Sequence, residues 1–157
     1  MSKNGLQWGF VAGYAFRGGP VLTLDVKGRL TVPSRYRDTL MSTVEGQMVI
    51  SKNHAGCLTL FPKPVWESFE AELARLPMKH EGWRRLYIGS ATDVEIDAGS
   101  RVLVPPELRS WAGLAREVVF MGVVDRFELW DKARYEAGEA LTIAGGLPEE
   151  LQNKVNA

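Results

Sequence analysis

The chain has 157 residues, of which 45% are apolar and 24% charged, and its 19 basic residues balance 19 acidic ones. This composition is typical of a soluble globular protein, and no apolar run approaches the roughly 20 residues of a membrane-spanning helix. The single cysteine, Cys57, excludes an internal disulfide and favours a reducing cytoplasm, and residues 1–19 lack the compact apolar stretch of a signal peptide. The neutral balance counts against nucleic-acid binding, but binding depends on where the charges lie.

The first predicted elements are two short strands, Val21–Leu24 and Arg29–Val32, on either side of a turn. Gly28 supplies the positive φ that a tight hairpin turn requires. Pro33 stands where the second strand gives way to a short helix, a position at which its missing N–H is no loss. A second hairpin is predicted over 47–61.

A helical connector follows. Its apolar residues recur at helical spacing and share one face: Val65, Phe69, Leu73 and Leu76. Pro77 terminates this helix, because proline cannot donate the next backbone hydrogen bond. A second helix over 80–89 is expected to present Trp83 and Tyr87.

The second half of the chain repeats the first. Four residues recur at one common offset: Asp25, Arg29, Pro33 and Arg37 become Asp97, Arg101, Pro105 and Arg109. In the second copy Leu108 and Ala112 are expected on the buried face of a short helix that Gly113 ends. A further hairpin is predicted from Glu117–Gly122 and Arg126–Trp130. An internal repeat of this kind indicates two copies of one small β-rich unit.

These patterns predict a mainly β fold with short helices, an α+β class, in five segments. The segments are an N-terminal extension (1–18), repeat 1 (19–66), a helical connector (67–90), repeat 2 (91–135) and a C-terminal tail (136–157). Both ends of the chain carry weak patterns and are expected to fray.

Several ordered motifs resemble the MraZ family of transcription regulators. They are Phe16-Arg17-Gly18, Leu24-Asp25-Val26-Lys27-Gly28-Arg29-Leu30, Pro33-Ser34-Arg35-Tyr36-Arg37, Val104-Pro105, Ala112-Gly113-Leu114 and Phe127-Glu128-Leu129-Trp130. The resemblance covers roughly residues 15 to 154. Two departures stand out. Residues 1–15 precede the usual start of the family, and the order Gly99-Ser100-Arg101 replaces a glycine directly before the arginine, so the turn is expected to shift by one residue.

The resemblance implies a tandem AbrB-like swapped-hairpin β-barrel, in which both halves of one chain form a pseudo-dimer. It implies a ring-shaped homo-oligomer in the cytoplasm, associated with the nucleoid. It also implies that the protein binds repeated boxes of double-stranded DNA upstream of its own division and cell-wall operon, mainly as a repressor. The Asp-x-x-x-Arg element of each repeat then lines the DNA-binding face.

Local charge supports a DNA-binding role for the first repeat. Residues 16–37 contain five cations and one acid, whereas the matched stretch 94–109 contains two cations and three acids. Phosphate attraction therefore favours repeat 1. The candidate DNA-binding residues are Arg29, Lys27, Arg17, Arg35 and Arg101. Four others are assigned structural roles, as turn supports and helix-to-sheet ion pairs: Asp25, Asp97, Arg37 and Arg109.

Other interpretations stay open or lack support. The Asp25–Arg29 pair on its own fits a simple ion pair that locks a hairpin, and Arg101 is equally balanced between DNA contact and structure. His54, His80 and Cys57 are too few for a four-ligand zinc site, and no base is marked for a cysteine nucleophile. We expect no enzyme activity, cofactor, metal, membrane or small-molecule substrate. The alternative function is an antitoxin-like protein-interaction module on the same fold, which the short tail disfavours.

Overall fold

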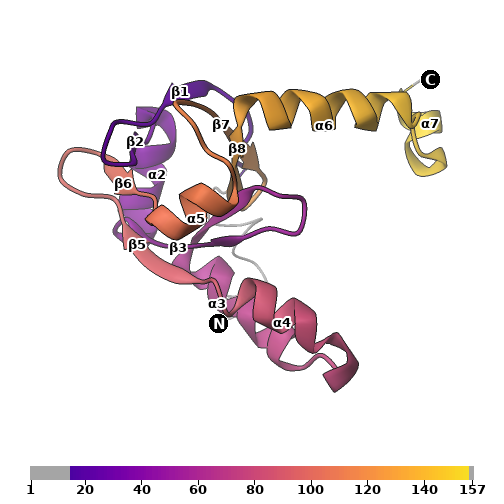
Figure 1. Ribbon diagram of the computed structural model, residues 1–157, viewed down its shortest axis with the longest axis horizontal. Helices are drawn as coiled ribbons and strands as arrows, with labels where there is room; N and C mark the ends of the chain where they lie inside the picture. The colour runs from indigo at the N-terminus through magenta and orange to yellow at the C-terminus, as the bar shows by residue number, and fades with distance from the viewer. Residues whose placement is uncertain (1–14, 156–157) are drawn as a thin grey trace.

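The computed structural model describes residues 15–155 (Figure 1). Its elements, in chain order, are β1 (Val21–Thr23), β2 (Arg29–Thr31), α2 (Ser34–Val44), β3 (Gln47–Lys52), β4 (Leu58–Pro62), α3 (Lys63–Ala74), η1 (Met78–His80), α4 (Glu81–Tyr87), β5 (Thr92–Glu95), β6 (Arg101–Leu103), α5 (Pro106–Trp111), β7 (Glu117–Val123), β8 (Arg126–Asp131), α6 (Lys132–Ala144) and α7 (Glu149–Val155). The order strand, strand, helix, strand, strand, helix occurs twice, from β1 to α3 and from β5 to α6. The internal repeat is therefore a repeat of structure as well as of sequence.

The strands form an antiparallel six-stranded sheet, in the order β1-β7-β8-β4-β3-β5, and a separate two-stranded sheet of β2 and β6. The predicted hairpins β3–β4 and β7–β8 are present. The first predicted hairpin is not, because β1 pairs with β7 and β2 pairs with β6. Likewise β5 of the second half pairs with β3 of the first. The first two strands of each repeat therefore pair with strands of the other repeat.

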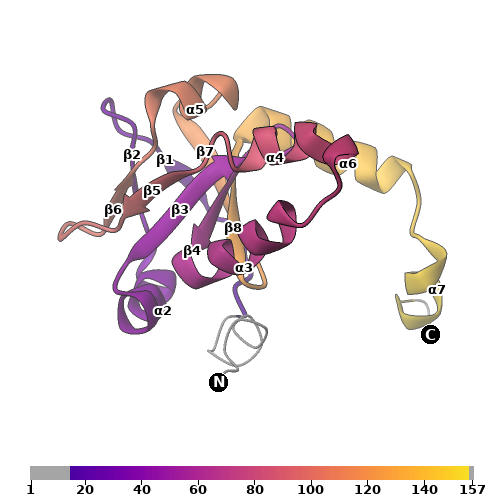
Figure 2. The ribbon, with the colours of Figure 1, turned by 90° about the horizontal axis from the view of Figure 1, so that it is seen from below.

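The mainly antiparallel α+β architecture agrees with the predicted class, but the expected closed barrel does not form within residues 15–155. The two edge strands of the larger sheet, β1 and β5, continue through turns into β2 and β6. β2 and β6 pair with each other as a separate sheet. β1 and β5, at the two edges of the larger sheet, do not pair with each other. Figure 2 shows the two-stranded sheet at one end of the molecule.

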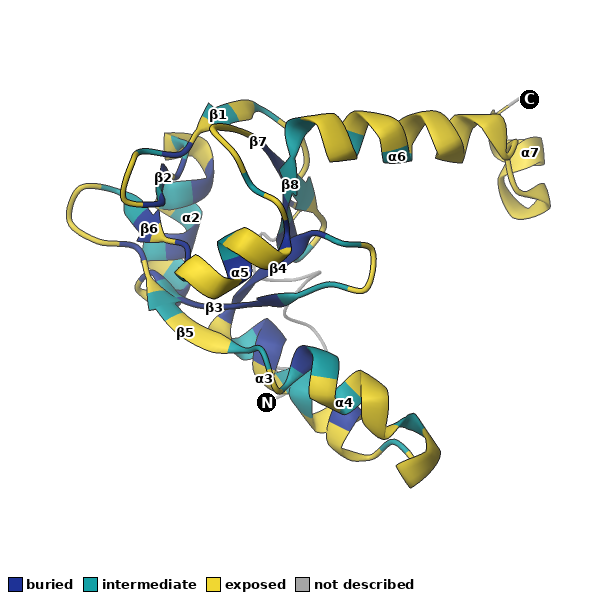
Figure 3. Cartoon of the chain, viewed as in Figure 1, coloured by how far each residue is buried: buried dark blue, intermediate teal, exposed yellow. Residues whose placement is uncertain are grey.

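The core is mostly aliphatic and contains a cluster of packed aromatic rings. Phe120 and Phe127 stack with their centroids 4.6 Å apart, and Phe16 lies 4.4 Å from Phe127. Phe16 forms a β-bridge to Val124 and is only 7% exposed, so it belongs to the folded body. Figure 3 shows that buried residues concentrate in the strands and on the inner faces of α2 and α3.

The connector contains the two predicted helices but buries one of the two aromatic residues that it was expected to present, and the C-terminal segment differs from its prediction. α3 ends at Ala74, shortly before Pro77, and α4 exposes Trp83 while burying Tyr87. The tail that was expected to fray instead contains α6 and α7, and none of the residues of these helices is buried. The rest of the N-terminal extension, residues 1–14, lies outside the described residues. Among residues 15–155, no helix combines the length and the apolar character needed to span a bilayer.

Candidate nucleic-acid interface

The turn of repeat 1 is built around the carboxylate of Asp25. One oxygen, Oδ1, accepts hydrogen bonds from the backbone N–H groups of Lys27 at 2.9 Å and Arg29 at 2.8 Å. The other oxygen, Oδ2, accepts the Nε–H of the Arg29 side chain at 2.7 Å. The backbone N–H of Arg29 is the main reason that the pKa of Asp25 falls from 3.8 to about 2, because these donors favour the charged carboxylate.

The turn of repeat 2 has the same backbone design. The Oδ1 atom of Asp97 accepts the N–H groups of Gly99 at 2.8 Å and Arg101 at 2.9 Å, and the N–H of Arg101 is the main cause that lowers the pKa of Asp97. Ser100 occupies the place of Gly28, with φ of 65° against 84°. The expected one-residue shift of the turn therefore does not occur, because the serine accepts the left-handed conformation. Arg101 is held more loosely, with its Nε atom 3.6 Å from Asp97 Oδ2.

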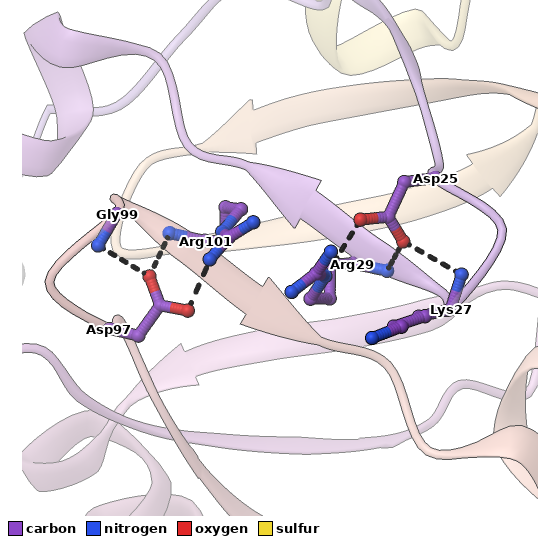
Figure 4. A network of polar contacts seen from close by, with 6 residues as sticks. All are labelled: Asp25, Lys27, Arg29, Asp97, Gly99 and Arg101. Atoms are coloured by element: carbon purple, nitrogen blue, oxygen red, sulfur yellow. Dashed lines mark hydrogen bonds and ion pairs between the residues drawn. The ribbon is translucent and has the colours of Figure 1, made fainter.

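The strands that follow the two turns pair as the antiparallel β2–β6 ribbon, with one turn at each end (Figure 4). The register pairs Leu30 with Val102, and both side chains are 1% exposed and belong to the core. Alternation along a strand then directs Arg29 and Arg101 outward, with side chains 31% and 37% exposed. Arg29 also contributes to lowering the pKa of Asp97, so the two halves are electrostatically coupled. The structure thus brings the two predicted arginines onto one surface.

Each turn also rests on the opposite repeat. The carbonyl of Gly28 accepts the N–H of Val104 at 2.9 Å, and the carbonyl of Ser100 accepts the N–H of Val32 at 2.8 Å. The Arg109 guanidinium lies against Gly28 so closely that an added Cβ would come within 2.5 Å of its Cζ atom. The position of the first turn is therefore set partly by residues of the second repeat.

Arg17 and Arg35 belong to a different cluster, around Tyr36. The Tyr36 hydroxyl donates to the backbone carbonyl of Arg17 at 2.5 Å, and the Arg35 guanidinium lies 4.6 Å from the Tyr36 ring centroid. Both arginines are exposed, as is Lys27 at the tip of the first turn. The structure therefore presents Lys27 beside the ribbon arginines, whereas Arg17 and Arg35 enter no hydrogen bond of the Asp–Arg network.

Among residues 15–155, neither Arg37 nor Arg109 forms the expected helix-to-sheet ion pair. Arg37 Nη1 lies 3.6 Å from Asp38 Oδ1 of the same helix, so this pair does not tie helix to sheet. Arg109 has no carboxylate oxygen within 4.0 Å among residues 15–155, and its Nε is buried without a hydrogen-bond partner. Arg109 packs against the glycine of the first turn instead, because the missing Cβ leaves room for its flat guanidinium.

Three residues on the same ribbon were missed by the sequence analysis. Leu103 is 52% exposed and lies opposite Arg29, Thr31 lies opposite Arg101, and Val26 at the turn tip is 97% exposed. The two-residue period of a strand could have revealed the first two, since positions 103 and 31 share a face with the arginines. Exposed apolar groups beside arginine suit contact with the thymine methyl group.

The histidine and cysteine residues offer no comparable site. His54 Nδ1 lies 2.8 Å from the Tyr87 hydroxyl, which ties the β3–β4 turn to α4. Cys57 is fully buried, and burial raises the pKa of its thiol by disfavouring the thiolate. In the part of the chain that the structure describes, no three His, Cys, Asp or Glu side chains are grouped as metal ligands would be.

The fold and the ribbon define a class of protein: two interlocked β-rich repeats in one chain, which jointly present an arginine-bearing two-stranded ribbon. A family model described as "MraZ protein, putative antitoxin-like" matches residues 15–86 and again 87–150. The chain is 50% identical over 141 residues to the "Transcriptional regulator MraZ" of Methylibium petroleiphilum, covering 90% of this chain and 97% of that protein.

Proteins of the same name in Burkholderia mallei and Burkholderia thailandensis are each 50% identical over 138 residues, covering 88% of this chain and 97% of theirs. The chain belongs to the MraZ family, whose relatives named here are called transcriptional regulators.

Proposed function

We propose that this protein is a sequence-specific regulator of transcription that binds double-stranded DNA through the β2–β6 ribbon. The observation that carries the proposal is the pair of outward arginines, Arg29 and Arg101, on a ribbon whose inner face is anchored in the core. A two-stranded ribbon fits the major groove of B-DNA, and arginine pairs bidentately with guanine there.

The turn of repeat 1 supports this role because it fixes Arg29 before DNA arrives. Asp25 holds both the backbone and the side chain of Arg29, so less rotamer freedom is lost on binding. Lys27, exposed at the tip of the turn, is suited to a phosphate contact as a compact point charge. Arg17 and Arg35, around Tyr36, would add phosphate contacts beside the ribbon.

The regulatory details rest on the family and on the names of the relatives. We infer that the protein acts mainly as a repressor on repeated boxes upstream of its own division and cell-wall operon, in association with the nucleoid. The exchanged strands are compatible with an AbrB-like swapped-hairpin pseudo-dimer. A ring-shaped homo-oligomer would place several ribbons near consecutive boxes, and linked sites can raise apparent affinity by about 10²–10⁴.

The decisive experiment is a titration of the protein onto a DNA fragment from upstream of its own gene, scored by footprinting. Wild type should protect regularly spaced boxes, and Arg29→Ala should lose that protection. Lys63→Ala is a matched control, because it removes an exposed cation at the start of α3, away from the ribbon. Equal binding by wild type and Arg29→Ala would contradict the proposal. Retention of a protein partner without any DNA binding would favour the antitoxin-like alternative.

A further inference from the structure

The helices α3 and α6 occupy equivalent places in the two repeats but have different surroundings. α3 buries Val65, Trp66 and Leu73 and is covered by α4, whose Tyr87 ring lies 5.2 Å from the ring of Phe69. α6 has no buried residue, and nothing in the described chain covers it as α4 covers α3. Figure 3 shows α6 as a largely exposed rod that projects from the body.

The C-terminal arm, residues 136–155, has the composition of a surface that a partner covers. Its large apolar side chains are exposed: Leu141 75%, Ile143 74%, Leu147 40%, Leu151 44% and Val155 64%. Helices as short as α6 and α7 are marginal in water without tertiary packing. The arm carries four glutamates, at positions 136, 139, 149 and 150, against one lysine at 154. A partner surface should therefore be both apolar and basic.

The connector tip, residues 75–85, has that complementary character. Met78 is 86% exposed and Trp83 48% exposed. The tip contains four cations, at positions 75, 79, 84 and 85, and one acid, Glu81. Arg84 is paired with Glu81 and donates to two backbone carbonyls, so it is used internally. Within residues 15–155 no carboxylate pairs with the other three cations, Arg75, Lys79 and Arg85.

We propose that the C-terminal arm of one chain docks on the connector tip of a second copy of this chain. Figure 1 shows the two surfaces on separate projections of the molecule, so one chain can engage two neighbours. An interface between two different surfaces is heterologous and continues from copy to copy until it closes into a ring. Pairing of two arms is disfavoured, because each arm carries four glutamates against one lysine and two arms therefore repel each other. The inference rests on the assembly in the proposed function and gives that assembly a specific interface.

This pairing can be tested by reversing the charge of the arm, of the tip, and of both surfaces together in one chain. The arm variant Glu149→Lys/Glu150→Lys and the tip variant Arg75→Glu/Lys79→Glu should each sediment as a single chain at micromolar concentration. The two pairs of changes combined in one chain should restore the large assembly. The control Asp93→Lys/Glu107→Lys makes the same change of charge at exposed positions outside both surfaces and should keep the wild-type size. An arm variant that retains the wild-type size, or a combined variant that stays single, would overturn the interface.

A mixing experiment shows whether the two surfaces differ. Leu141→Ser should disable the arm and Trp83→Ser the tip, and each variant should be a single chain that keeps a cooperative urea unfolding transition. Mixed together, they should form a one-to-one dimer, because only one intact arm meets one intact tip. Larger assemblies from the mixture, or none, would contradict head-to-tail docking.

The docking proposal and the DNA-binding proposal can be tested separately. Arg29→Ala should lose DNA but keep its size. The arm variant should change size but still bind a single box weakly. If Arg29→Ala loses DNA while the arm variant retains wild-type size, the docking proposal is wrong and the DNA-binding proposal stands. If the arm variant becomes a single chain while Arg29→Ala binds DNA like wild type, the DNA-binding proposal is wrong and the docking proposal stands.

Discussion

The two Asp-x-x-x-Arg turns share one backbone and differ in how they hold the arginine. In both, a carboxylate oxygen accepts two backbone N–H groups at 2.8–2.9 Å. In repeat 1 the second oxygen also accepts Arg29 Nε at 2.7 Å, whereas Arg101 Nε stays 3.6 Å from Asp97. The difference teaches that the aspartate builds the turn in each repeat but fixes the arginine in only one of them.

The turns differ in two further residues, which affect charge and strain. Lys27 stands where repeat 2 has Gly99, so the second turn lacks a cation at its tip. Gly28 stands where repeat 2 has Ser100, which holds a positive φ at a conformational cost. Repeat 1 is therefore the better-organised half of the ribbon, and the following substitutions test that asymmetry in order of expected effect.

The largest effect is expected from the arginines. Arg29→Ala should weaken binding to the upstream fragment by about 1–3 kcal/mol per site, because a preorganised bidentate base contact is lost. Arg101→Ala should cost less. Fluorescence titrations of both variants at two salt concentrations, with size checked by light scattering, compare them directly. A larger loss for Arg101→Ala would reverse the asymmetry.

The glycine and serine of the turns should respond in opposite directions. Gly28→Ala should lower the free energy of unfolding by about 1–2 kcal/mol from the left-handed backbone alone, with a further loss from the 2.5 Å approach to Arg109. Ser100→Gly should raise it by on the order of 0.5 kcal/mol, since relief of strain is offset partly by added chain entropy. Urea unfolding measures both. A destabilised Ser100→Gly variant would show that the serine makes a compensating contact.

The carboxylates should give the two turns different acid sensitivity. The folded-state pKa of Asp25 is about 2, below its ordinary 3.8, so the unfolded chain binds the proton more readily between these values. The stability that this carboxylate contributes is therefore present above its unfolded pKa and lost as pH falls through the folded pKa. Asp25→Asn should flatten the decline in urea midpoint between about pH 5 and pH 2. Asp97→Asn should flatten this decline less. An equal change in the two variants would indicate that the two carboxylates stabilise their turns equally.

The smallest effect concerns the tips of the turns. Lys27→Ala should weaken binding to all DNA sequences and reduce the salt slope by about 0.9, as expected for one lost phosphate contact. Gly99→Lys should do the reverse in repeat 2, provided that the new Cβ is accommodated 3.1 Å from Arg101 Nε. Binding to specific and random fragments across a salt series distinguishes these outcomes. An unchanged slope for Lys27→Ala would place this lysine away from the phosphates.

Local structure was predictable from the sequence because its causes are local. The aspartate at the start of each turn, the prolines after β2 and β6, and the helical spacing of Val65, Phe69 and Leu73 act within a few residues. Strand partners depend on surfaces far apart in the chain. Nothing near Val21 indicates that it pairs with Val119, so a hairpin of β1 with β2 was expected instead.

The candidate site was predictable in its residues but not in its assembly. The turn motif identified Asp25, Arg29, Asp97 and Arg101 from their repetition. Their meeting on one ribbon depends on the pairing of β2 with β6, which no short-range pattern specifies. The more basic turn of repeat 1 and the less basic turn of repeat 2 therefore lie on one surface rather than on two. α6 was missed for a related reason: it buries none of its residues in the chain, so its amphipathic signal is weak.

The exchange of strands has a consequence for the synthesis of the chain. β1 is made early, but its partner β7 and the adjoining β8 are made near the end, after the whole connector. A nascent chain on the ribosome therefore cannot complete either sheet until most of its length has emerged. Pairing between such distant segments slows folding, because a long loop must close before the contacts form. During that interval the apolar edges of β3 and β4 remain open, and premature release of a truncated chain should yield an aggregation-prone product rather than a folded half.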